Sequence, residues 1–212
     1  MRNDSLASRQ TQAPYPAESA ERHVLLAAAL FLLIGFALQW WRMQSLIASM
    51  DQGILMQVLW NGMQGHPFES TLSSQLSTNV IHSGELPAPG YHRLGQHFTP
   101  ILALWIPLVG LLGKWALPML LAVLIAAAGL VLHRIAQRQL KPYLAARVTI
   151  AFYGANAVIA PYMLSNFTDL SQLPLCVFLL ILGLERQQRW LTWAAALAIP
   201  LIRDERFRTD GA

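Results

Sequence analysis

Charged residues are scarce in this sequence, and cysteine is almost missing. Only 12% of the 212 residues are Asp, Glu, Lys or Arg, whereas soluble domains average about a quarter charged. The single cysteine, Cys176, lies in an apolar run, which excludes an internal disulfide and a cysteine-based metal cluster. The basic excess, a formal net charge of +4, lacks the interleaved aromatics that bind RNA or single strands, so no nucleic-acid partner is expected.

Familiar catalytic motifs are also missing. The sequence has no GxGxxG, P-loop, GxSxG or HExxH pattern. The apolar runs hold no carboxylate and no basic pair near their middle, although ion-coupled transporters normally need such groups. These absences count against transport and against the common soluble enzyme classes.

What the chain does have is a series of long apolar runs, and 55% of its residues are hydrophobic. A helix needs roughly 20 mostly apolar residues to cross a bilayer, with about 17 as the lower limit. Three runs reach that length and two are shorter, and so many runs in one chain disfavour a soluble core. We predict an all-α, polytopic membrane domain over residues 23–203, with about five transmembrane helices at 23–42, 115–133, 144–164, 170–185 and 190–203.

Basic connectors predict how this domain is oriented. Positive clusters follow the second and fourth predicted spans, and the positive-inside rule places both in the cytoplasm. Residues 1–22 are then a disordered cytoplasmic tail, and the long first loop, 45–114, lies outside the plasma (inner) membrane, in the periplasm. A cleaved signal peptide is the alternative for residues 1–50. Residues 98–113 must be interfacial or re-entrant, because a crossing there would put the next basic connector outside.

Asp51 is the most informative residue of the outer loop. Ser49 and Gln52 fit a capping box around it, which starts a helix. That helix should lie along the membrane surface, because its apolar residues share one face. They are Ile54, Leu55, Val58, Leu59 and Gly62. A carboxylate at this place can offset the helix dipole, and it can also act as a general base or anchor a metal while facing a lipid-linked substrate. The two roles do not exclude each other.

Three more residues of the predicted outer side are candidates for the same site. Asp169 lies in the short connection between the third and fourth spans. Two carboxylates from separate loops could hold a divalent cation or divide acid and base roles. The alternative for Asp169 is a solvated loop residue or a helix cap. Arg93 and His97 could engage a phosphate, and only Arg93 keeps its charge at every physiological pH. No histidine spacing in the loop predicts zinc.

Two segments of the outer loop carry a family resemblance. Residues 50–68 contain DQGILMQVLWN followed by GHPF, and residues 94–100 read LGQHFTP. On these motifs, about residues 25–203 resemble a family of predicted bacterial polytopic membrane proteins that is catalogued as a domain of unknown function. That family looks related to the GT-C superfamily of membrane glycosyltransferases, which includes protein mannosyltransferases and aminoarabinose transferases.

The resemblance implies a set of roles. GT-C enzymes carry an essential acidic residue early in the first outer loop, where this chain has Asp51, and often a second one before a leucine, as in Asp169-Leu170. The implied donor is a polyprenyl-phosphate-linked sugar, with Asp51 as general base and Asp169 helping to bind a divalent cation or the donor phosphate. Arg93 and His97 would contact phosphate, and His97 stands where the aminoarabinose branch has a lysine.

The chain also departs from the family pattern. Gln96 replaces a commonly acidic residue, and Ser171 replaces a frequent histidine. Residues 204–212 form a charged tail where the family continues with apolar sequence, which predicts a truncated or frame-shifted product. Three hypotheses follow: the N-terminal part of a GT-C-like glycosyltransferase, a non-catalytic membrane protein (transporter fragment or scaffold), or an inactive fragment.

Overall fold

The computed structural model describes residues 17–202, and every regular element in that range is a helix. The all-α prediction is therefore confirmed for these residues. The predictions for residues 1–16 of the tail and for the charged end at 203–212 lie outside the described residues. Helix α1 begins at Ala17, six residues ahead of the predicted first span.

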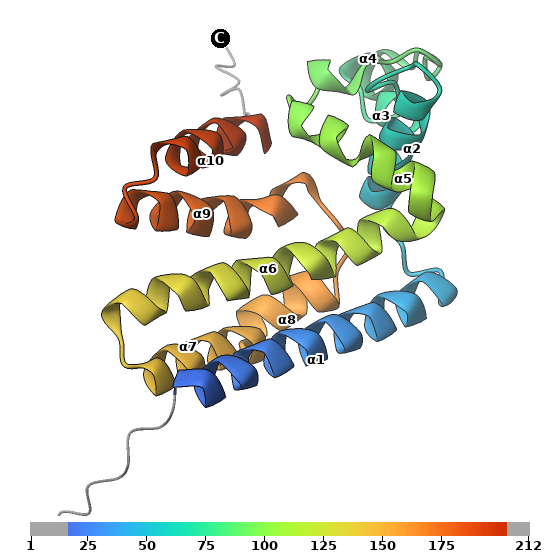
Figure 1. Ribbon diagram of the computed structural model, residues 1–212. Helices are drawn as coiled ribbons and strands as arrows, with labels where there is room; N and C mark the ends of the chain where they lie inside the picture. Colours follow the sequence, from blue (N-terminus) through green and yellow to red (C-terminus); the bar gives the residue numbers. More distant parts are fainter. Residues whose placement is uncertain (1–16, 203–212) are drawn as a thin grey trace, which may run out of the picture.

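Three helices form the body of the molecule and pack side by side (Figure 1). They are α1 (Ala17–Gln44), α6 (Ala116–Gln139) and α7 (Pro142–Gly154). Phe31 of α1, Ile125 of α6 and Tyr153 of α7 belong to one buried cluster at their interface. Because apolar residues surround α6 on most sides, it can serve as the central helix of the bundle.

Two helical segments are long and apolar enough to cross a membrane, Glu18–Gln44 and Pro100–Gln139. Helices α7 and α8 (Asn156–Met163) are bent by 46° at a short break and make a third span if they are counted as one. Helices α9 (Leu173–Glu185) and α10 (Arg189–Ile202) have 13 and 14 residues, well short of the roughly 20 that a span needs. The described chain thus supports two or three spans, and five remains a prediction.

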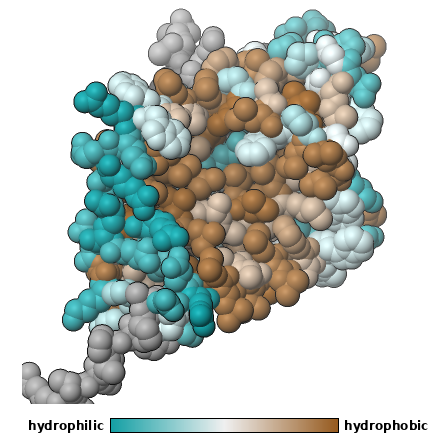
Figure 2. Space-filling model, in the orientation of Figure 1, coloured by the Kyte–Doolittle hydropathy of each residue, from teal (hydrophilic) through white to brown (hydrophobic). Residues whose placement is uncertain are grey.

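Large apolar side chains cover the flank of the bundle. Leu33, Leu111 and Leu197 are 65%, 81% and 62% exposed. Figure 2 shows this flank as one broad hydrophobic surface. A continuous apolar surface of this kind is stable only against lipid or another apolar partner, so the protein is expected to sit in a bilayer.

The residues between α1 and α6 fold into short helices at one end of the bundle (Figure 1). The first is α2, and it starts directly after the N-cap Ser49. The elements are α2 (Met50–Met63), α3 (Thr71–Ser74), α4 (Thr78–Ser83), η1 (Arg93–Gly95), η2 (Pro100–Trp105), α5 (Ile106–Leu112) and η3 (Gly113–Trp115).

The segment predicted to be interfacial or re-entrant is broken into η2, α5 and η3. Gly113 has a φ of +54°, which favours glycine and interrupts the path into α6. Helix α5 packs on α2 so closely that a Cβ on Gly62 would lie 2.7 Å from Ile106 Cδ1. The segment is therefore tied to α2; its placement at the membrane surface stays a prediction.

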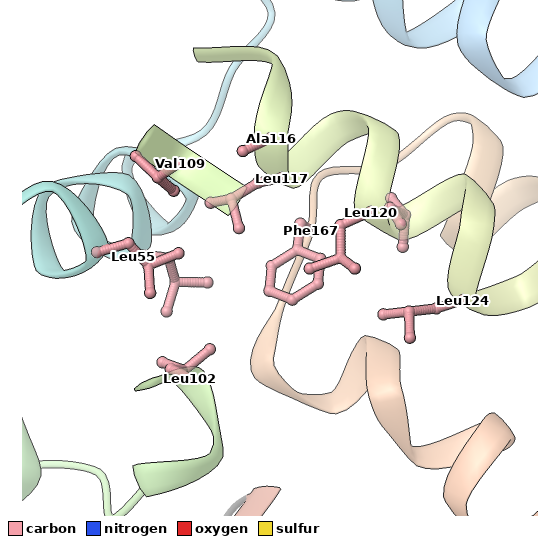
Figure 3. Packing of buried hydrophobic residues seen from close by; sticks show 10 residues of the cluster. Leu55, Leu102, Val109, Ala116, Leu117, Leu120, Leu124 and Phe167 are labelled. Atoms are coloured by element: carbon pink, nitrogen blue, oxygen red, sulfur yellow. The ribbon is translucent and has the colours of Figure 1, made fainter. Parts of the chain in front are cut away.

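A buried cluster joins this outer region to the bundle (Figure 3). Phe167, from the connection between α8 and α9, is fully buried in it, as is Leu59 of α2. The cluster holds Leu55, Leu59, Leu102, Val109, Ala116, Leu117, Leu120, Leu121, Leu124 and Phe167. It fixes α2 and the connection that carries Asp169 relative to one another.

Candidate functional site

Asp51 lies in the first turn of α2 with its side chain exposed. Ser49 caps this helix, because its Oγ accepts a hydrogen bond from Gln52 N at 3.3 Å. The reciprocal half of the predicted capping box does not form, since Gln52 Nε2 contacts Met43 Sδ at 3.4 Å instead. Ser49 therefore caps the N-terminus of α2, and the Asp51 carboxylate remains open to a ligand.

Arg93 and Asp169 form a buried ion pair. Arg93 Nη2 lies 3.9 Å from Asp169 Oδ2, and the two residues are only 8% and 5% exposed. They come from η1 and from η4 (Asp169–Gln172), which are far apart in the sequence. A buried charge is costly, and the pairing offsets part of that cost for each side chain.

Backbone pairing holds Arg93 in place. Arg93 N donates to Phe68 O at 2.9 Å, and Ser70 N donates to Tyr91 O at 2.9 Å. Asn61 of α2 donates from Nδ2 to the intervening Glu69 O at 2.9 Å. The arginine is thus positioned from α2 through two short extended segments.

Asp169 is held by the first turn of η4. Thr168 N donates to Ser171 Oγ at 3.0 Å, which closes the capping box of that turn. Gln172 Nε2 donates to Asp169 O at 3.1 Å, and Gln172 Oε1 accepts from Trp105 Nε1 at 2.6 Å. Thr168, and not Asp169, is the N-cap of this turn, and the buried Asp169 carboxylate faces Arg93.

Side chains at the C-terminal end of α1 bind the same connection between α8 and α9. The buried Gln39 donates from Nε2 to Ser165 O at 2.9 Å, and Arg42 Nη2 donates to Asn166 Oδ1 at 3.2 Å. Arg42 Nη1 also donates to Leu164 O. Sequence reasoning missed this role; the available signal was a lone glutamine in an apolar run, one turn before an arginine.

His97 and Thr99 follow Arg93 along the chain. His97 N donates to Arg93 O at 2.9 Å, so the histidine is fixed one turn after the arginine, and its side chain is half-buried. Thr99 is fully buried, and its Oγ1 has no hydrogen-bond partner among the described residues. Sequence reasoning gave Thr99 no role, although it belongs to the LGQHFTP motif.

The donor set gives little support to a divalent cation. The described residues contain no group of three or more His, Cys, Asp or Glu that could hold a metal ion. The Asp169 carboxylate faces the Arg93 guanidinium, which already supplies a positive charge. The predicted metal at Asp169 and Asp51 remains a prediction.

Comparison with known proteins gives one match. The sequence model of a family described as "Predicted membrane protein (DUF2079)" matches residues 42–207. The match includes both outer-loop motifs and all four predicted site residues. No curated protein and no solved structure matches the chain. Since the matched segment is most of the chain, this protein belongs to the DUF2079 family of predicted membrane proteins.

Proposed function

We propose that the outer end of the bundle binds a polyprenyl-phosphate-linked sugar, and that the chain carries part of a GT-C-like glycosyltransferase site. One observation carries the proposal: an exposed carboxylate, Asp51, heads a helix that is packed onto the connection holding the buried Arg93–Asp169 pair. Packing alone accounts for neither the exposed acid nor the buried charges. In the proposed orientation, the N-terminus is cytoplasmic and residues 45–114 are periplasmic.

Asp51 acts as the general base in this reaction. The acceptor hydroxyl oxygen attacks the anomeric carbon of the sugar while its proton passes to the Asp51 carboxylate. The bond between the anomeric carbon and the phosphate oxygen breaks, and the lipid phosphate leaves with the electron pair. An exposed carboxylate beside the membrane can reach both the lipid carrier and a water-borne acceptor.

Arg93 binds the phosphate of the lipid carrier in this proposal, and Asp169 positions its guanidinium. A charge fixed in a low-dielectric place stabilises a leaving phosphate more strongly than a solvated one does. His97 is a second phosphate contact, placed by the bond from its backbone to Arg93 O. Arg93 also keeps its charge when the local pH changes.

Replacing Asp51 by Asn should abolish sugar transfer. A positioned general base contributes roughly a hundredfold to ten-thousandfold in rate, and Asn is nearly isosteric but cannot take the proton. The measurement is transfer of radiolabelled sugar from a polyprenyl-phosphate-linked hexose to a soluble hydroxyl acceptor by the purified chain in detergent. Glu85→Gln, which removes an exposed carboxylate of the same outer region, is the matched control and should keep full activity.

Two outcomes would contradict the assignment of Asp51 as the general base. Equal rates for the wild type and Asp51→Asn would remove Asp51 from the chemistry. A wild type without turnover, together with unchanged folding of Asp51→Ala, would favour the non-catalytic scaffold. Thermal unfolding of each variant distinguishes a lost reaction from a lost fold.

A further inference from the structure

The ends of five helices meet at the side of the bundle opposite the outer region (Figure 1). Arg134 near the end of α6 pairs with Glu21 at the start of α1, with Nη2 and Oε1 3.0 Å apart. Arg138 of α6 pairs with Glu185 at the end of α9, with Nε and Oε2 3.5 Å apart. The starts of α7 and α10 follow directly after the ends of α6 and α9, so they lie at the same end.

Positive charge is concentrated on this end, which we call the basic end. Among the described residues it carries seven basic side chains against three acidic ones. Figure 2 shows it as a hydrophilic band that borders the apolar flank. The basic residues are Arg22, Arg134, Arg138, Lys141, Arg147, Arg186 and Arg189, and the acidic ones are Glu18, Glu21 and Glu185.

Five of these cations remain available to a ligand. Two of the acidic residues are occupied by Arg134 and Arg138. The other five basic side chains are exposed and form no ion pair within the described part of the chain. An uncompensated cluster of this kind attracts a polyanion or an anionic surface.

Two exposed tryptophans lie beside the basic end, a pattern typical of a membrane surface. Trp190 and Trp193 are 72% and 66% exposed, and they lie directly after Arg189 on one face of α10. Leu197 continues that face into the apolar flank. Tryptophan is enriched at the boundary between headgroups and acyl chains, because its ring is apolar and its N–H is polar.

The turn between α9 and α10 presents these residues rigidly. A Cβ on Gly183 would lie 2.8 Å from Thr192 N, so the two helices are in close backbone contact. Thr192 Oγ1 also donates to Gln188 O in the turn, at 3.1 Å. Arg186, Arg189 and the tryptophans are thus held on a closely packed hairpin.

The outer end of the bundle has no such excess of positive charge. Its described residues include four carboxylates and three lysine or arginine side chains, so it is close to neutral. Those carboxylates are Asp51, Glu69, Glu85 and Asp169, and the cations are Arg42, Arg93 and Lys114. The two ends of the same bundle therefore differ in the surface that each can face.

We propose that the basic end is a binding surface for anionic phospholipid headgroups of the bilayer, with Lys141, Arg186 and Arg189 contacting the phosphates. Trp190 and Trp193 fix the depth of the hairpin beside those headgroups. Basic clusters next to membrane helices are attracted to an anionic leaflet, and each Lys or Arg adds to that attraction. This site is distinct from the proposed sugar site, and neither depends on the other.

The test titrates the purified full chain, in neutral detergent, with short-chain phosphatidylglycerol or phosphatidylcholine and measures the dissociation constant of each lipid. We expect phosphatidylglycerol to bind about tenfold more tightly or better, given three contacting cations. The triple variant Lys141→Gln/Arg186→Gln/Arg189→Gln should bind both lipids equally. The double variant Arg186→Lys/Arg189→Lys should keep the preference, because it keeps the charge.

A matched pair of single variants decides the question if the triple variant does not fold. Arg189→Gln and Lys114→Gln each remove an exposed cation that precedes a tryptophan, at opposite ends of the bundle. Only Arg189→Gln should weaken phosphatidylglycerol binding. Equal losses in both variants, or an unchanged preference in the triple variant, would overturn the proposal. Displacement of the lipid by equimolar inorganic phosphate would also overturn it, by showing a general anion patch.

Discussion

Asp169→Asn should lower the free energy of unfolding by about 3–5 kcal/mol, because it leaves the Arg93 guanidinium buried beside an uncharged side chain. Both members of the pair are less than a tenth exposed, so water cannot replace the lost carboxylate. Arg93→Met should lower the free energy of unfolding by a similar amount, since it leaves the Asp169 carboxylate buried without the arginine. The measurement is unfolding of the purified protein in detergent, followed by circular dichroism.

The double variant Arg93→Met/Asp169→Leu separates this pairing from simple packing. Replacing both partners of a buried ion pair by apolar residues of similar size is often neutral or stabilising. We therefore expect the double variant to recover most of the stability that each single variant loses. Additive losses in the double variant would show that the two side chains do not depend on each other. Glu85→Gln, at an exposed carboxylate, should leave the unfolding midpoint unchanged.

The same single and double variants of Arg93 and Asp169 also test the proposed function. If Arg93 binds a lipid phosphate, the double variant should fold but fail to bind a polyprenyl phosphate. A folded double variant with unchanged polyprenyl phosphate affinity would give the pair a structural role only. Stability and binding thus report separately on the two roles of one ion pair.

Local signals predicted the helices well. The apolar runs indicated α1 and α6, and the capping pattern at Ser49 correctly marked the start of α2. Pairings between distant segments could not be predicted in this way. Nothing near Asp169 indicates that Arg93 is its partner, because contacts between segments distant in sequence, such as Phe167 with Leu55 and Trp105 with Gln172, position the connection that carries it.

The number of spans was hard to predict for a related reason. An apolar run of given length can be one straight helix or two short ones. The run predicted as 144–164 is interrupted at Ala155, whose ψ of 135° is extended, directly after Gly154 at the end of α7. A glycine near the end of a helix can mark such a break, but the apolar composition of the run does not.

Gly129→Ala should destabilise the bundle by about 2 kcal/mol, because the added methyl group overpacks the contact between α6 and α7. A Cβ at Gly129 would lie 2.4 Å from Tyr153 Cζ and 2.5 Å from the Tyr153 hydroxyl oxygen. That hydroxyl donates to Ala126 O at 2.7 Å, so the ring cannot move aside without breaking a buried hydrogen bond. Alanine favours a helix over glycine by about 1 kcal/mol, and the overlap must exceed this gain.

Gly154→Ala is the matched control, because a Cβ there meets nothing within 4 Å. It should leave the unfolding midpoint unchanged or raise it slightly. In a Tyr153→Ala background the overlap is gone, so Gly129→Ala should then be neutral or stabilising. A Gly129→Ala variant as stable as Gly154→Ala in the wild-type background would mean that α6 and α7 do not approach as closely as described. A loss that appears only with Tyr153 in place would show that glycine at this position sets the spacing of the two helices on which the outer site is built.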